Sequence, residues 1–453
     1  MSESPSKPPS NDPGATPPSP PPSEALPATQ RGPSSVRAMR QAPRKVAMIL
    51  SGGGARGAYE VGVLSYVLDD FARIRKKPPK IDILCGTSIG AINACYLAAH
   101  LEEPTFGIRR LVNLWTEINI DDVLGFSARQ ALALPRVLLG GGQEAVGLFD
   151  VTPMAKLIER EIPWRAITRT LRHGHLTALS VSATEVSSGR TVVFMQTGPD
   201  GTLPTRAPPR TVVRGTFIGP VHALASAAIP ILFPPVRIGS ELFMDGGIRQ
   251  NTPISPALRL GATHVFAVGL SRELRGPESG GEHAGHPGAA LIVGKILNAL
   301  LLDHVRHDLE ILTRVNEILA DGERAFGPDF VHQLNRTKRD RDIQYKRAEK
   351  MVVSPSEDIG RLAASYVRAG KLRGNRSLVR RLLSMVDVGY ATEADLASYL
   401  LFDGDFCRKL IELGRADAEA KRADIAAFFG SAEEQSAPEP SNREEWIIPP
   451  PTT

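Results

Sequence analysis

The chain has 453 residues, 42% of them hydrophobic, which is enough to bury one large globular core and an accessory region. The formal net charge of +5 is only mildly basic, which argues against a dedicated nucleic-acid binder, so no nucleic-acid partner is expected. The three cysteines form no CxxC pair, which argues against a disulfide framework and a structural zinc site, so no metal is expected.

Shifts in composition divide the chain into five predicted segments. Residues 1–43 are rich in proline and serine and lack the apolar core of a signal peptide, which predicts disorder and favours a cytoplasmic location. The following segments are an α/β domain (44–275), a linker (276–288), a mainly helical C-terminal region (289–430) and a disordered tail (431–453). No uninterrupted apolar run is long enough to span a bilayer, so any contact with a membrane would be peripheral.

Two strand–turn–helix units open the α/β domain. Val46–Leu50 has the pattern of a buried strand, Ser51–Gly57 that of a glycine-rich turn, and the stretch from Ala58 to Arg73 that of a helix. Ile81–Cys85 is a second predicted strand, and a predicted helix over Ile89–Ala99 follows it. This alternation predicts a mostly parallel sheet flanked by helices.

The rest of the chain adds strands first and helices afterwards. The later strand candidates of the α/β domain are Ala178–Ala183, Thr191–Gln196, Glu241–Met244 and His264–Val268. Beyond the linker, strand patterns are scarce and good helix formers recur at helical spacing. The predicted helices there include Leu291–Asp303, Asp308–Ala320, Asp358–Ala369 and Glu393–Leu401.

A serine stands at the turn between the second strand and its helix, in Gly86-Thr87-Ser88-Ile89-Gly90. A G-x-S-x-G at such a turn has the form of a nucleophile elbow, where the glycines permit a sharp bend and the helix N-terminus favours developing negative charge. Ser88 is therefore the candidate nucleophile, with Gly86 and Gly90 as the elbow glycines. The alternative is that Ser88 only caps its helix.

A second motif, GGGARG, follows the first strand and opens a helix. Its backbone N–H groups can converge on an anion, which in an acyl hydrolase would be the tetrahedral oxyanion. The motif also fits the dinucleotide fingerprint G-x-G-x-x-G, whose ribose-binding acid would be Asp69 or Asp70, but these lie in a predicted helix. This favours an oxyanion hole. Its candidate residues are Gly52, Gly53, Gly54, Arg56 and Gly57.

An aspartate ends the strand candidate Glu241–Met244 and precedes two glycines, in Asp245-Gly246-Gly247. A carboxylate at a strand end can accept the proton of a serine that lies within hydrogen-bonding reach. In isolation Asp-Gly is a common turn signal, so Asp245 gains weight only beside the other two motifs. A Ser-His-Asp triad stays open as well, because His264 follows Asp245 in the chain order of α/β-hydrolases.

The order GGGARG, GTSIG and DGG, each motif after a strand, resembles the patatin-like phospholipases over about residues 46–270. Two further segments, Ala225–Pro230 and Phe233–Pro235, resemble the stretch that precedes the aspartate strand in that family. The resemblance implies a three-layer α/β/α sandwich of patatin type. It also implies that Ser88 forms an acyl-enzyme and that Asp245 acts as the base, with no cofactor.

By the same resemblance, amides around Gly53 and Gly54 would hold the oxyanion, and Arg56 would face a phosphate or steady the loop. The implied substrate is a phospholipid or another acyl lipid at a membrane surface. The basic stretches Arg336–Arg347 and Arg368–Arg381 could approach anionic headgroups, although solvated helix faces have the same composition. An oligomer is compatible with the sequence, and a nucleotide- or phosphate-binding interaction protein stays as the alternative function.

Overall fold

The computed structural model describes residues 44–125, 147–205, 207–250, 253–272, 294–299, 303–336, 345–370 and 395–430. The predicted terminal segments 1–43 and 431–453 and the predicted linker 276–288 lie outside the described residues.

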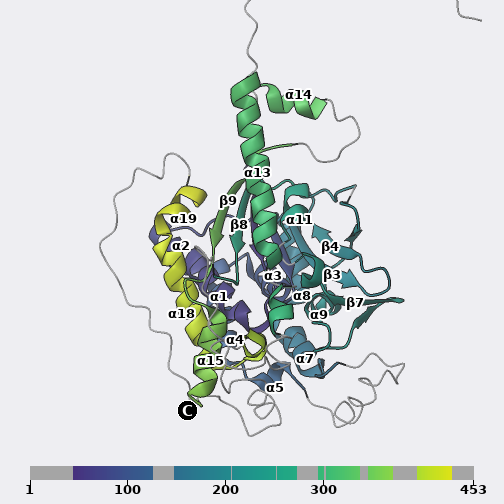
Figure 1. Cartoon of the computed structure of the whole chain (residues 1–453), viewed down its shortest axis with the longest axis vertical. Coiled ribbons are helices and arrows are strands. Elements are labelled where there is room, and N and C mark those ends of the chain that lie inside the picture. Colours follow the sequence, from purple (N-terminus) through teal and green to yellow (C-terminus); the bar gives the residue numbers. More distant parts are fainter. Residues whose placement is uncertain are drawn as a thin grey trace, which may run out of the picture. The chain divides into compact units, whose positions relative to one another are not determined.

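A nine-stranded sheet forms the centre of the described chain (Figure 1). Its strands are β1 (Val46–Leu50), β2 (Ile83–Thr87), β3 (Ala178–Glu185), β4 (Thr191–Thr197), β5 (Thr211–Gly215), β6 (Val236–Ile238), β7 (Glu241–Asp245), β8 (His264–Val268) and β9 (Glu349–Val353). The main order is β5-β4-β3-β2-β1-β8-β9, while β7 pairs with β3 and with β6. Five neighbouring pairs are parallel and three antiparallel, which confirms the predicted mostly parallel sheet.

Helices cover both faces of this sheet. Those of the first half are α1 (Gly57–Ser65), α2 (Phe71–Arg75), α3 (Ile89–His100), α4 (Pro104–Glu117), α5 (Ile120–Val123), α7 (Thr152–Glu161), α8 (Trp164–Arg172), α9 (Pro220–Ala227), α10 (Gly247–Gln250) and α11 (Ile254–Arg259). The later ones are α13 (Asp303–Phe326), α14 (Phe330–Arg336), α15 (Ile359–Arg368), α17 (Asp395–Leu400), α18 (Gly404–Ala420) and α19 (Arg422–Phe429). A 3-10 turn η1 (Gly54–Arg56) precedes α1, and a π-helical turn η2 (Tyr66–Asp70) joins α1 to α2.

The central strands are buried on both faces, and their side chains alternate between two cores. In β1, Met48 and Leu50 join the core under α1 and α3, whereas Ala47 and Ile49 join the core under α11 and α13. A strand with both faces covered needs apolar side chains at every position, which is the pattern VAMIL shows. The three-layer α/β/α sandwich is therefore confirmed.

The C-terminal region contributes to this fold at two places. Strand β9, which the sequence analysis did not predict, pairs in parallel with β8 and extends the sheet at that edge. Helix α18 packs on α1 so closely that a Cβ on Gly62 would lie 2.2 Å from the carbonyl oxygen of Ile411. The described residues from Arg44 to Gly430 accordingly belong to one compact unit.

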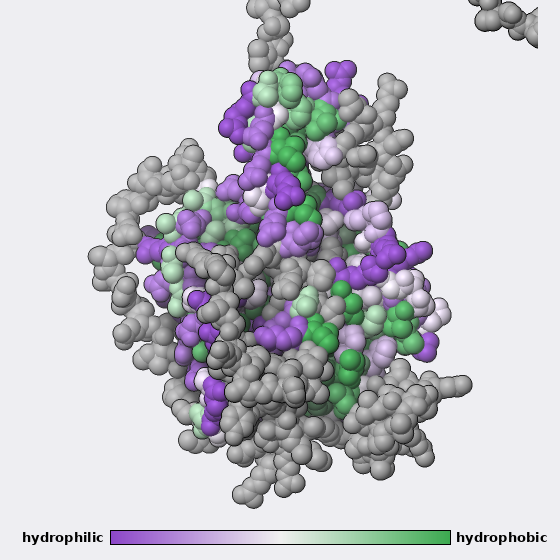
Figure 2. All heavy atoms as spheres, in the orientation of Figure 1, coloured by the Kyte–Doolittle hydropathy of each residue, from purple (hydrophilic) through white to green (hydrophobic). Residues whose placement is uncertain are grey.

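Helix α13 lies over the core on the second face of the sheet, where Leu309 and Leu312 are buried. Its outer side stays apolar in part, because Ile311, Ile318 and Phe326 are exposed, and Figure 2 shows hydrophobic residues along this helix. Among the described residues, none of the helices combines the length and the apolar composition that crossing a membrane requires.

Candidate active site

Ser88 occupies the sharp turn between β2 and α3. Its backbone has φ 55° and ψ −130°, a strained conformation for a residue with a side chain and a feature of nucleophile elbows. The flanking glycines are required by close approach: a Cβ on Gly86 would lie 2.4 Å from the oxygen of Gly90, and one on Gly90 would lie 2.4 Å from the oxygen of Leu50. The strand, the turn and the helix predicted around Ser88 are all present.

Strand β3 brings Ser88 and Asp245 together. Its first five residues pair in parallel with β2, and the last of these pairs joins Ser182 to Thr87. From the next residue, Ala183, β3 pairs in antiparallel fashion with β7, beginning at Asp245. Strand β7 therefore pairs with the same side of β3 as β2 does, starting where β2 ends and α3 begins. This places Ser88, the residue after Thr87, next to Asp245, the last residue of β7.

The two side chains are in direct contact. The Ser88 hydroxyl donates a hydrogen bond of 2.6 Å to Asp245 Oδ2, and the Gly247 N–H donates one of 2.7 Å to Oδ1. Asp245 is fully buried, and this burial raises its pKa to about 7, although the hydrogen bonds from Ser88 and Gly247 act in the opposite direction. A carboxylate with such a pKa can accept and return a proton near neutral pH.

Ser226, at the end of α9, supports the elbow and was not among the predicted site residues. Its hydroxyl oxygen accepts a hydrogen bond of 2.9 Å from the Ser88 N–H, and its own proton goes to the carbonyl oxygen of Ser182 at 2.6 Å. The Asp245 N–H donates to the Ala228 carbonyl oxygen at 2.8 Å. The sequence drew attention to Ala225–Pro230 only because this segment resembles the family, and no local pattern within it indicated a role for Ser226.

The glycine-rich loop leaves the sheet beside the elbow, because Leu50 of β1 pairs with Gly86 of β2. It also touches the elbow from its far end, since a Cβ on Gly57 would lie 2.7 Å from Ile89. Gly54 has φ +57°, a left-handed conformation that a glycine adopts without strain. The loop residues Gly52, Gly53, Gly54, Arg56 and Gly57 are buried.

Glu60 of α1 ties the loop to the nucleophile helix. Its Oε1 accepts a 2.6 Å hydrogen bond from the Ser51 N–H, and its Oε2 accepts one of 3.1 Å from Asn93 on α3. Asn93 in turn accepts a hydrogen bond from the Trp115 indole at 3.2 Å. Burial raises the pKa of Glu60 to about 8, although the hydrogen bonds from Asn93 and Ser51 act in the opposite direction. No motif in the sequence had indicated Glu60.

Arg56 is held by side chains of the C-terminal region. It is only 3% exposed, its Nε donates to Ser398 Oγ at 2.8 Å, and its Nη2 forms an ion pair of 3.2 Å with Asp395. Of the two roles considered for Arg56, these contacts favour support of the loop over contact with a phosphate.

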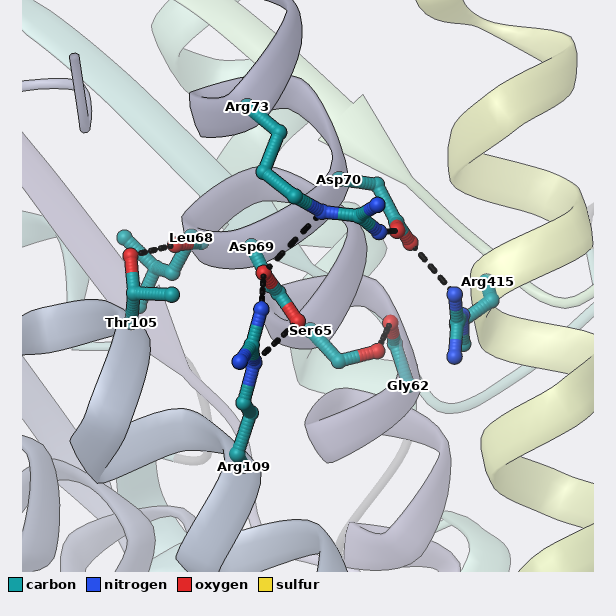
Figure 3. Close-up of polar contacts among 9 residues, drawn as sticks. All are labelled: Gly62, Ser65, Leu68, Asp69, Asp70, Arg73, Thr105, Arg109 and Arg415. Atoms are coloured by element: carbon teal, nitrogen blue, oxygen red, sulfur yellow. Dashed lines mark hydrogen bonds and ion pairs between the residues drawn. The ribbon is translucent and has the colours of Figure 1, made fainter. Parts of the chain in front are cut away.

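Asp69 and Asp70 are engaged by arginines, as Figure 3 shows. Arg109 donates two hydrogen bonds of 2.8 Å to Asp69, and Arg415 of α18 donates one of 2.6 Å to Asp70. Arg73 forms ion pairs with both carboxylates. Since both acids lie in η2 within this cluster of charges, they do not stand at a strand end as a ribose-binding acid would.

His264 lies at the opposite end of the parallel strands from Ser88. It pairs with Val46 at the start of β1, whereas the elbow adjoins the end of that strand, about 13 Å further along. Its Nε2 is 3.0 Å from Glu349 Oε2. The structure does not bring His264 to the serine, which removes the basis for a Ser-His-Asp triad.

An apolar cavity of about 70 Å³ lies along α3, starting at the residue next to the nucleophile. Helices α3, α4, α5 and α7 line it, together with one residue just after α4, one just after α7, and Phe402 of the C-terminal region. The lining residues are Ile89, Ile92, Asn93, Tyr96, Leu111, Leu114, Trp115, Ile118, Val123, Met154, Leu157, Ile158, Glu161, Ile162 and Phe402.

Within the described ranges, one set of side chains has donor atoms close enough to share a metal ion: Glu102, His173 and His175. Glu102 is already paired with Arg169 at 2.9 Å, and the set lies beyond the C-terminal end of α3, about 18 Å along the helix from Ser88. It is therefore separate from the candidate active site.

A mostly parallel sheet with helices on both faces and a serine turn at the end of β2 defines an α/β protein with a patatin-like fold. Residues 48–258 match the family model described as Patatin-like phospholipase, and this segment of the chain belongs to that family.

Three similar proteins illustrate the likeness. The cGAMP-activated phospholipase of Pseudomonas aeruginosa is 30% identical over 214 residues, which cover 46% of this chain and 53% of that protein. An uncharacterized NTE family protein of Mycobacterium tuberculosis is 24% identical over 246 residues, 54% of each chain. Human GIVD cytosolic phospholipase A2 is 13% identical, with a TM-score of 0.38, 85% of this chain covered and 59% of that chain. The chain spans about half the length of the curated relatives that it matches.

Proposed function

We propose that this chain hydrolyses carboxylic ester bonds of lipids, as a phospholipase A or lysophospholipase does, with Ser88 as the nucleophile and Asp245 as the base. The observation that carries the proposal is the 2.6 Å hydrogen bond between their side chains at a strained strand-to-helix turn. The family match and a phospholipase relative support lipid as the class of substrate.

In the first half of the reaction, Ser88 Oγ attacks the carbonyl carbon of the ester while its proton passes to Asp245 Oδ2. The carbonyl oxygen becomes an oxyanion, which the backbone N–H groups of Gly53 and Gly54 in the loop beside the elbow would stabilise. The tetrahedral intermediate collapses, the bond to the alcohol oxygen breaks, and the alcohol leaves with the proton from Asp245. The fatty acyl group stays on Ser88 as an ester.

In the second half, water attacks the acyl-enzyme and Asp245 takes the water proton. A second oxyanion forms in the same place, the bond to Ser88 Oγ breaks, and the fatty acid is released as Ser88 regains a proton from Asp245. A buried carboxyl with a pKa of about 7 suits both directions of transfer, because neither protonation state is strongly favoured near neutral pH. The residues of this chain account for each step without a cofactor.

The apolar cavity beside Ile89 supports an aliphatic acyl chain as the group bound next to the reacting carbonyl. Burying methylene groups there gains about 0.8 kcal/mol each, so binding would strengthen with chain length until the cavity is filled. A peripheral location at a membrane in the cytoplasm remains our prediction from the sequence. Most of the two basic stretches predicted to approach headgroups lies outside the described residues.

The test is hydrolysis of a short chromogenic ester and of phospholipid vesicles by the wild type and by the variants Ser88→Ala, Asp245→Asn and His264→Ala. We expect no measurable turnover for the first two variants, each folded by circular dichroism, because they lack the nucleophile and the base. His264→Ala should stay within about twofold of the wild type, since this residue lies at the opposite end of the parallel strands.

An active Ser88→Ala protein would refute the proposal. If His264→Ala alone lost activity, the triad would replace the serine–aspartate pair. If the wild type cleaved no ester but bound phosphate compounds irrespective of Ser88, the phosphate-binding alternative would be favoured.

A further inference from the structure

The C-terminal helix α17 packs directly against the glycine-rich loop. A Cβ on Gly54 would lie 2.3 Å from the carbonyl oxygen of Tyr399, so the backbones of the two segments touch. Both segments are buried, although they are more than three hundred residues apart in the sequence. The conformation of the loop at Gly54 is therefore set in part by a helix that the family match, residues 48–258, does not include.

Arg56 anchors the loop to this helix. Its Nε donates to Ser398 Oγ at 2.8 Å, its Nη2 lies 3.2 Å from Asp395 Oδ1, and its guanidinium stacks on the Tyr399 ring at 4.7 Å. Nη2 also donates to Asn298 Oδ1 at 3.3 Å, and Asn298 accepts a further hydrogen bond from the Tyr399 hydroxyl. Four side chains thus fix the position of one guanidinium.

The charge balance makes Asp395 the central member of this cluster. An arginine that is 3% exposed is costly without a counter-charge, and Asp395 provides the carboxylate, with Lys295 3.0 Å away on its other side. Burial by itself would raise the pKa of Asp395, but the charges of Arg56 and Lys295 outweigh burial and hold the pKa below its usual value. The ion pair therefore persists across the neutral pH range.

We propose that Asp395 is a positioning residue for the hydrolysis: it holds Arg56 and thereby holds the adjoining amides of Gly53 and Gly54 in the geometry that stabilises the oxyanion. The inference rests on the proposed function for its effect on the rate. Arg56 closes the 3-10 turn η1, which begins at Gly54, so a shift of its side chain moves the backbone that supplies the donors. A misplacement of about 1 Å at such donors can cost on the order of 10²-fold in rate.

The chain offers a matched control in Asp70. This carboxylate also contacts two arginines, Arg73 on the adjoining helix α2 and Arg415 on α18, and so it also joins the N-terminal half of the chain to the C-terminal helices (Figure 3). It lies in η2, beyond the whole length of α1 from the glycine loop. If a variant acted only by weakening the packing of the C-terminal helices on the rest of the chain, replacing either carboxylate would lower the activity to a similar degree.

The experiment compares Asp395→Asn with Asp70→Asn in the full chain, using the short chromogenic ester. We expect Asp395→Asn to lower kcat about 10²-fold with KM within about twofold, because oxyanion donors act in the transition state and not in substrate binding. Asp70→Asn should stay within about twofold of the wild type in both constants. Equal losses in the two variants, or none in either, would overturn the proposal.

A double variant tests whether Asp395 acts through Arg56. If it does, Arg56→Gln with Asp395→Asn should be no slower than Arg56→Gln alone, whereas additive losses would contradict the coupling. Should Asp395→Asn fail to fold, Ser398→Ala removes one acceptor of the guanidinium without leaving a charge unpaired, and a kcat about tenfold lower is expected. An unchanged kcat in folded Ser398→Ala would count against the proposal.

Hydrogen exchange gives a readout that does not depend on activity. The amides of residues 52–57 should exchange faster in Asp395→Asn than in Asp70→Asn or the wild type, and equal protection in all three would refute positioning. If the wild type hydrolyses no ester while this difference is present, the proposed function fails and the positioning of the loop stands.

Discussion

The nucleophile elbow and the glycine-rich loop leave the same edge of the sheet, yet different parts of the chain hold them. The elbow is held by Ser226 and Asp245, both inside the segment that matches the family. The loop is held in addition by α17, where Asp395 and Tyr399 contact it from outside that segment. The family match thus contains both proposed reacting residues and still lacks part of the structure that orders the loop beside them.

The largest effect is expected when the C-terminal helices, which hold the loop but not the elbow, are removed. A chain truncated before Asp395 exposes the face of α1 that α18 covers, where buried side chains such as Leu410 and Ile411 each contribute about 1.5–3 kcal/mol. Together with Phe406, Ile425 and Phe428, which are also buried, the lost contacts are comparable to the roughly 5–15 kcal/mol that stabilises a domain, so we expect an unfolded or insoluble protein by circular dichroism. A chain ending at Gly430 is the control and should stay folded. A soluble and active truncated protein would show that α17, α18 and α19 are not needed to fold the chain or to order the site.

The next effect in size is expected for Gly54→Ala. The new Cβ would meet the Tyr399 carbonyl oxygen and would force a side chain into φ +57°, so the loop has to shift away from α17. We expect kcat for the short ester to fall by about 10²- to 10³-fold, as for the loss of one oxyanion donor. Gly174→Ala is the matched control, because Gly174 also has positive φ but no atom within 4 Å of its Cβ position. Equal activities of the two variants would mean that α17 does not shape the loop.

The pH dependence of the rate distinguishes the role of Asp245 at the elbow from that of Asp395 at the loop. Only ionised Asp245 can act as the base, so kcat/KM should rise about tenfold per pH unit below pH 7 and level off above it, following the pKa of about 7. Asp395 is held ionised in this range, so Asp395→Asn should lower the whole profile without moving its midpoint. A profile that is flat between pH 5 and 7 would contradict Asp245 as the base.

A further effect, on stability and not on the rate, concerns Glu60, which also supports the loop. Its pKa is raised from the usual 4.5 to about 8, so the folded protein keeps a proton that the unfolded chain releases, and stability falls as pH rises through this window. Glu60→Gln carries no such proton. Between pH 5 and 8 its stability should therefore fall less than that of the wild type, by on the order of 1 kcal/mol per pH unit, in urea denaturation. Glu159→Gln, at an exposed carboxylate, is the control, and identical slopes in all three proteins would contradict the prediction.

The predictions from sequence succeeded where a pattern is local. A buried strand, a bend and a helix around Ser88 all lie within about twenty consecutive residues, and the uninterrupted apolar run of β1 indicated that both faces of the strand are covered. The position of Asp245 at a strand end was local as well. That Asp245 reaches Ser88 was not, because it depends on β3 exchanging one neighbour for another at Ser182 and Ala183.

The supports of the glycine loop left no local trace. Arg56 and Asp395 are 339 positions apart, and neither stands in a motif that points to the other. Strand β9 was missed because Glu349-Lys350-Met351-Val352-Val353 is short and begins with two charged residues, as suits an edge strand. Such contacts are long-range, and composition and periodicity describe only neighbours along the chain.

The late position of β9 and α17 in the chain also bears on synthesis. Ser88 and Asp245 have both been synthesised once residue 247 has been added, but the segment that holds the glycine loop follows more than a hundred residues later. At about 5–20 residues per second, a nascent chain spends on the order of 10–30 s with both residues present and with α17 and α18 still missing. Because those helices cover α1 and hold the loop, we expect the proposed active site to form only after they have been synthesised.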